Sequence, residues 1–110
     1  MEELVKNQLS EDGILLDLEN QGIGRTELEK LSKLEPIPTL EKIYLSDNGL
    51  GDEDIKIFAQ CKISDNITHI YLNHNNIGES GGDGIKALAE SDLAKNLICL
   101  MLEANKINSL

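Results

Sequence analysis

Residues 67–78 read ITHIYLNHNNIG, and residues 40–51 read LEKIYLSDNGLG, which is the same pattern 27 positions earlier. In both stretches an Ile and a Leu stand two residues apart, a spacing that points both side chains to one face of a strand. An Asn follows three residues after the Leu, where its amide can satisfy backbone groups as the chain turns out of the strand. The two copies therefore predict a repeated unit of strand and turn.

The pattern extends outward to two further copies. Residues 13–24 read GILLDLENQGIG, and residues 97–107 read LICLMLEANKI. The central leucines of the four copies fall at positions 18, 45, 72 and 102, so the steps are 27, 27 and 30 residues. Self-similarity at a fixed period of about 20–50 residues is typical of repeat architectures.

Between the strands the apolar spacing changes to that of a helix. The apolar residues three apart are Leu28, Leu31 and Leu34, then Ile55 and Phe58, then Ile85 and Leu88. This spacing predicts one helix after each of the first three strands. We expect the first helix to begin with a capping box of Thr26 and Glu29, and the next two to be capped by Asp52 and Asp83.

A strand and a helix in every 27–30 residues pack as a right-handed coil, with parallel strands on one side and helices on the other. The pattern L-x-x-L-x-L-x-x-N-x-L resembles the leucine-rich repeat. The repeat length, the helical spacing and the Asn-x-Ile-Gly turn are similar to the ribonuclease-inhibitor-like subclass. The resemblance covers residues 13–107 and implies a short α/β solenoid, with parallel strands on the concave face and helices on the convex face.

We expect one leucine-rich repeat domain over residues 1–110, with a cap-like segment at 1–12 and repeats beginning near residues 13, 40, 67 and 97. The sequence ends just after the last strand turn. This end leaves two interpretations open: a complete small domain, or a terminal or structural segment of a larger leucine-rich repeat protein. In either case an uncovered last strand invites edge pairing, so we expect a homodimer through residues 97–107.

Composition narrows the class of partner. Twenty Asp and Glu against ten Lys and Arg give a net charge of −10, which argues against the basic surfaces that bind nucleic acid or anionic membranes. The excess of acid favours a protein partner with a basic patch. No apolar run approaches the roughly 18 residues of a membrane span.

The N-terminus and the cysteines indicate a cellular compartment. Residues 1–6 read MEELVK, which is acidic and lacks the apolar segment of a secretory signal. Cys61 and Cys99 are too few for a disulfide framework and are typical of reduced thiols. We therefore expect an intracellular, cytoplasmic protein.

The candidate site follows from the strand pattern, because the positions between the core residues project from the concave side. Tyr44 and Tyr71 hold the same repeat position, so we expect them about 4.8 Å apart on adjacent strands. Tyrosine is a rigid, half-apolar residue that anchors protein interfaces, although it also simply suits an exposed strand. The predicted partner-binding residues are Asp17, Lys42, Tyr44, Asp47, His69, Tyr71, His74 and Met101.

The residue types that serve in catalytic or metal sites do not form a recognisable catalytic motif in this sequence. Ser46, Asp47, His69 and His74 contain the residue types of a hydrolytic triad, but nothing in the sequence supplies a strained nucleophile turn or an oxyanion hole. His69 and His74 are five apart with no third ligand at a fixed spacing, so we predict no metal and no cofactor. Arg25 is the only arginine. It leaves a GTPase-activating-type regulator, known in this repeat subclass, as the lowest alternative to a non-catalytic protein-interaction module.

Overall fold

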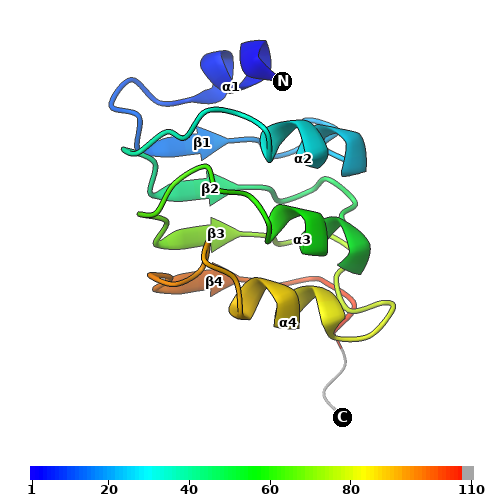
Figure 1. The fold of residues 1–110 in the computed structure, drawn as a ribbon. Helices are drawn as coiled ribbons and strands as arrows, with labels where there is room; N and C mark the ends of the chain where they lie inside the picture. Colours follow the sequence, from blue (N-terminus) through cyan, green and yellow to red (C-terminus); the bar gives the residue numbers. More distant parts are fainter. Residues whose placement is uncertain (108–110) are drawn as a thin grey trace.

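The protein is described by a computed structural model over residues 1–107; the last three residues of the predicted domain lie outside this range. One four-stranded parallel sheet runs in chain order, β1-β2-β3-β4. Its strands are Leu15–Asp17, Lys42–Tyr44, His69–Tyr71 and Cys99–Met101. The helices α2 (Arg25–Leu31), α3 (Asp52–Phe58) and α4 (Asp83–Ala89) stack side by side along the other side of the molecule (Figure 1). The predicted alternation of strand and helix is confirmed.

The repeat step sets the register of the sheet. Ile43 pairs with Leu16 on one side and with Ile70 on the other, so residues one repeat apart stand directly opposite each other. These three side chains are fully buried, as are Leu18, Leu45 and Leu72 two residues later. Phe58 is the one aromatic side chain in this core, which is otherwise aliphatic apart from Cys61.

An asparagine side chain joins neighbouring repeats at each strand exit. Asn75 is buried, and its Oδ1 accepts from the backbone N–H groups of Asn48 (3.0 Å) and Leu50 (2.9 Å) in the preceding repeat. Its Nδ2 donates to the carbonyls of Leu45 (3.1 Å) and Leu72 (3.0 Å). The predicted role of this residue, satisfying backbone groups at the turn, is confirmed and extends across the repeat boundary.

The predicted helix starts are wrong by one or two residues. The N-cap of α2 is Gly24, and its N–H donates to Glu27 Oε1 (2.8 Å), which is the main cause of a lowered Glu27 pKa. The predicted box of Thr26 and Glu29 therefore does not form. A glycine is the N-cap of each of the helices α2, α3 and α4. Asp83 accordingly lies inside α4, after its N-cap Gly82.

Asp52, also predicted as an N-cap, is the first residue of α3 and has a different function. Gly51 is the cap, and its N–H donates to Asp54 Oδ2 (2.9 Å). The buried Asp52 carboxylate instead accepts from the N–H groups of Gly78 (3.0 Å) and Ser80 (3.0 Å) in the next repeat. It thereby fastens the longer loop that carries the three extra residues of the last step.

The two ends of the sheet differ. At the first end, α1 (Glu2–Gln8) lies over β1 (Figure 1), and Leu9 forms an antiparallel bridge with Leu16. At the other end, no strand within residues 1–107 lies beside the outer edge of β4. Two apolar side chains near that edge are open to solvent, Ile98 at 78% exposure and Ile107 at 50%.

Candidate functional site: a tyrosine row on the concave face

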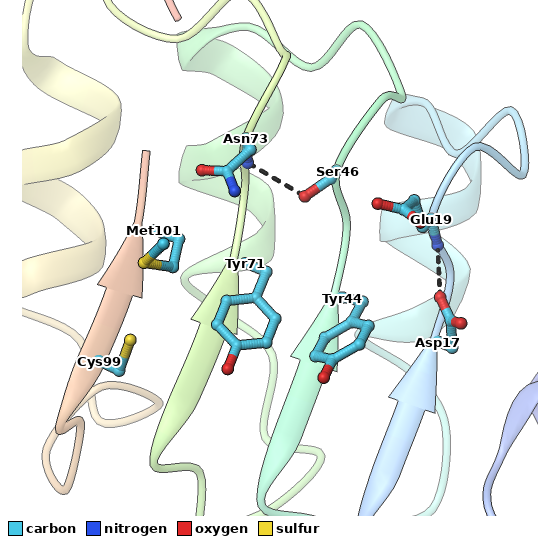
Figure 2. A pocket seen from close by; sticks show the side chains of 8 residues that line it. All are labelled: Asp17, Glu19, Tyr44, Ser46, Tyr71, Asn73, Cys99 and Met101. Carbon is cyan, nitrogen blue, oxygen red and sulfur yellow. Dashed lines mark hydrogen bonds between the residues drawn. The ribbon is translucent and has the colours of Figure 1, made fainter. Parts of the chain in front are cut away.

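Four predicted site residues form one continuous row across the sheet. Asp17, Tyr44, Tyr71 and Met101, here called the tyrosine row, are register partners on β1, β2, β3 and β4. The ring centroids of Tyr44 and Tyr71 lie 4.5 Å apart with the ring planes at 47°, close to the expected strand spacing. Figure 2 shows the two rings side by side, with Asp17 beyond one and Met101 beyond the other.

The alternation of the strands holds these rings on the surface. Leu45 and Leu72, one residue after each tyrosine, are fully buried, so the tyrosines must point to the opposite face. Partial burial raises the pKa of Tyr44, and the neighbouring Tyr71 and Asp17 raise it further. A tyrosine hydroxyl is protonated at neutral pH already at its ordinary pKa, so Tyr44 can donate a hydrogen bond there.

A second set of residues completes a shallow hollow of about 390 Å³ around the tyrosine row. Ser46 is buried, and its Oγ accepts from the Asn73 N–H (3.1 Å), while the Asp17 carboxylate accepts from the Glu19 N–H (3.1 Å), as drawn in Figure 2. The residues that line the hollow besides the tyrosine row are Glu19, Ser46, Asn73 and Cys99. None of these four is in the predicted site. Glu19, Ser46 and Asn73 stand two residues after their row members, a spacing that could have found them.

The other four predicted residues lie outside this hollow. Lys42 and His69 are partners in the neighbouring row with Cys99, and the His69 ring packs edge-on at 6.3 Å from Tyr71. Asp47 and His74 are exposed in the turns after β2 and β3, each with a left-handed φ of 58° and 57°. The predicted set of eight thus divides between the hollow, the adjacent row and the turns.

Comparison with known proteins adds one match. A family model described as Leucine Rich Repeat matches residues 39–61, which contain β2 and α3. The fold is that of a short leucine-rich repeat solenoid. The searches of curated proteins and of solved structures each found no match.

Outside the hollow, two side chains of reactive types are Arg25, which pairs with an acidic residue, and Cys61, which is buried. The Arg25 Nε lies 3.5 Å from an Asp54 carboxylate oxygen, pairing α2 with α3 on the helical side. Burial raises the pKa of the Cys61 thiol to about 12. Over residues 1–107, no three His, Cys, Asp or Glu residues gather as metal ligands would, and no helix is long and apolar enough to cross a membrane.

Proposed function

We propose that this protein is a non-catalytic protein-binding module of the ribonuclease-inhibitor-like subclass, and that its tyrosine row is the contact surface. The observation that carries the proposal is the pair of tyrosines whose tilted rings pack against each other, held in register on the concave face. Paired aromatic side chains on a rigid scaffold lose little rotamer freedom when a partner docks. The repeat steps of 27 and 30 residues, each with a strand and a short helix, support the subclass.

The remaining predicted residues are proposed as the margin of the same contact. Lys42 and His69 extend the surface on the β2–β3 side, while Asp47 and His74 offer charged or polar groups from the turns. Margin residues of this kind set the association rate and the orientation of a partner more than the affinity. We propose an intracellular location, supported by two free thiols at Cys61 and Cys99.

A test compares three baits: the wild-type chain, Tyr44→Ala/Tyr71→Ala, and Glu29→Ala/Lys33→Ala. The last pair is exposed on the helical side and serves as the matched control. A protein retained by the wild type is purified, and its Kd is measured against all three. We expect at least tenfold weaker binding for the tyrosine variant and an unchanged Kd for the control. Equal binding by all three, with circular dichroism showing each folded, contradicts the proposal.

The outer edge of β4, which no strand within residues 1–107 covers, favours a second role, the stacking of a further strand. Leu97, Leu100 and Leu102 are only half-buried there, whereas their counterparts in the inner repeats are fully buried. We propose that a second copy covers this edge. Because α1 covers the opposite end, copies cannot add head to tail, and the pairing closes as a two-fold dimer through β4. A larger leucine-rich repeat array would use the same edge.

A regulator that acts through Arg25 has less support. Its guanidinium is paired with Asp54 and lies at the start of α2, on the helical side away from the tyrosine row.

A further inference from the structure

The chemistry of the hollow changes from one side of the sheet to the other. Asp17 and Glu19 stand on the β1 side, the two tyrosine rings occupy the middle, and the sulfur-containing Cys99 and Met101 stand on β4 (Figure 2). A surface that is acidic at one end, aromatic in the middle and apolar at the other imposes a direction on whatever segment binds across it.

The two carboxylates at the acidic end are not neutralised by the fold. Among residues 1–107, none of the ion pairs includes Asp17 or Glu19. The hydrogen bond that Asp17 Oδ1 accepts comes from a backbone N–H, the amide of Glu19. Both negative charges therefore remain available to a cation that approaches over β1 and β2.

Tyr44 stands beside these charges and adds an aromatic face. It is the register partner of Asp17, and its ring packs at 4.5 Å against Tyr71. A cation within about 6 Å of a tyrosine ring is attracted by the ring quadrupole, and nearby carboxylates strengthen that attraction. Lys and Arg side chains satisfy both requirements, because an alkyl stem packs on the ring while the charged head reaches the acids.

The far end of the hollow suits an apolar group. Met101 is 40% exposed, an unusual exposure for a flexible thioether side chain that adapts to apolar partners. It is two strands from Tyr44, about 10 Å at the usual strand spacing. An extended peptide covers that distance in about three residues.

We infer that the segment bound by this face carries a Lys or Arg that seats on Tyr44 against Asp17 and Glu19, with an apolar residue three or four positions away seated on Met101. This inference rests on the proposed binding function of the tyrosine row. It replaces a general preference for basic partners, based on the net charge, with one local contact.

The test uses a library of random twelve-residue peptides selected on the immobilised full chain. We expect the enriched sequences to place a basic residue three or four positions from an apolar one. Enriched sequences that need Tyr44 and Tyr71 but lack the basic residue overturn the inference and leave the proposed function standing. Enrichment that is equal on Tyr44→Ala/Tyr71→Ala, or no enrichment at all, counts against both.

A charge-matched pair of variants then separates local recognition from the overall acidity. Asp17→Asn/Glu19→Gln and Glu29→Gln/Glu35→Gln each remove two negative charges, and the second pair is exposed on or next to α2. We expect the first variant to bind the selected basic peptide about tenfold more weakly and the second to change Kd less than twofold. An equal loss in both variants overturns the inference, because only the total charge would then matter.

Discussion

Single asparagines join the repeats of this protein. Asn48, Asn75 and Asn105 occupy the same position, and the Oδ1 of each accepts at least one backbone N–H from the repeat before it. An amide is needed here because the site presents donors and acceptors together; a carboxylate accepts only, and an apolar side chain does neither. The position was predictable from the sequence, because an amide side chain recurs there at the repeat spacing in all four copies, with Gln21 in the first.

Replacing Asn75 by Ala should be among the most damaging single changes. It removes the acceptor for the N–H groups of Asn48 and Leu50 in a buried setting, so we expect the free energy of unfolding to fall by about 3 kcal/mol. Asn76→Ala is the control, since among residues 1–107 its side-chain amide makes one hydrogen bond, a long one of 3.5 Å to the Gly49 carbonyl. Urea denaturation measures the free energy of unfolding of both variants. A similarly small loss in Asn75→Ala and Asn76→Ala would contradict the role of Asn75 in joining the repeats.

The two thiols should differ sharply in reactivity. Cys61 is buried with a pKa raised to about 12, whereas Cys99 is half-buried on the concave face. At pH 8 we expect iodoacetamide to modify the folded protein once, at Cys99, as seen by peptide mass mapping. Modification of Cys61 at the same rate as Cys99 would show that the core around it is open.

The same raised pKa predicts a loss of stability at high pH. The unfolded thiol ionises near its usual value of 9.0 and the folded one only near 12. Between these values protons are lost from the unfolded state first, so the contribution of Cys61 is intact below pH 9 and declines toward pH 12. Urea denaturation at pH 8 and at pH 10.5 measures the free energy of unfolding at each pH. We expect this free energy to fall less between the two pH values in Cys61→Val than in the wild type.

At the scale of elements, the positions of the helices and strands were predictable from the sequence. The N-cap residues of the helices and the hydrogen bonds between repeats were not. The leucine spacing located α2, and the repeat register located all four strands. The predicted helix starts are wrong because the usual polar N-cap is missing. The N-cap is a glycine, and its N–H donates to a side chain within the first turn of the helix, Glu27 in α2 and Asp54 in α3. Asp52 could not be assigned from local sequence at all, since its partners Gly78 and Ser80 lie one repeat away.

The spacing of α3 and α4 should depend on Gly84. A Cβ at this position would lie 2.9 Å from the Asp52 carbonyl oxygen. In an isolated helix, Gly→Ala stabilises by about 1 kcal/mol; here we expect Gly84→Ala to destabilise by about 1–2 kcal/mol, because the helices must separate. Gly82→Ala meets no neighbouring atom and should cost less, about 0.5 kcal/mol, because alanine is a poorer N-cap than glycine. Stabilisation by Gly84→Ala would contradict this packing.

At the scale of the whole molecule, the two ends of the sheet differ: α1 lies over β1, whereas no strand within residues 1–107 lies beside the outer edge of β4. The solenoid and its concave face were predictable, because four copies of one pattern in phase admit a single register. The composition of the hollow was only partly predictable: Tyr44 and Tyr71 were found as an aligned pair, while Glu19 and Ser46 were passed over. The place of Ser46 follows from a contact between repeats, because its buried side chain accepts from the N–H of Asn73 one repeat away.

The open end predicts concentration-dependent self-association. Pairing of two β4 edges would cover Ile98, which is 78% exposed. Sedimentation equilibrium should show a monomer–dimer equilibrium that Ile98→Lys shifts to monomer, while Ala89→Lys on exposed α4 surface leaves it unchanged. A wild-type chain that stays monomeric at all concentrations would rule out the proposed dimer.

The register that sets the tyrosine row is tested most directly by nuclear Overhauser effects between side chains in solution. With centroids 4.5 Å apart, the ring protons of Tyr44 and Tyr71 should give strong mutual effects, and those of Tyr71 should also reach the Met101 methyl group. Tyrosine rings that show no contact with each other, and that contact the methyl groups of Leu45 and Leu72 in the core instead, would contradict the assignment of faces and the binding surface built on it.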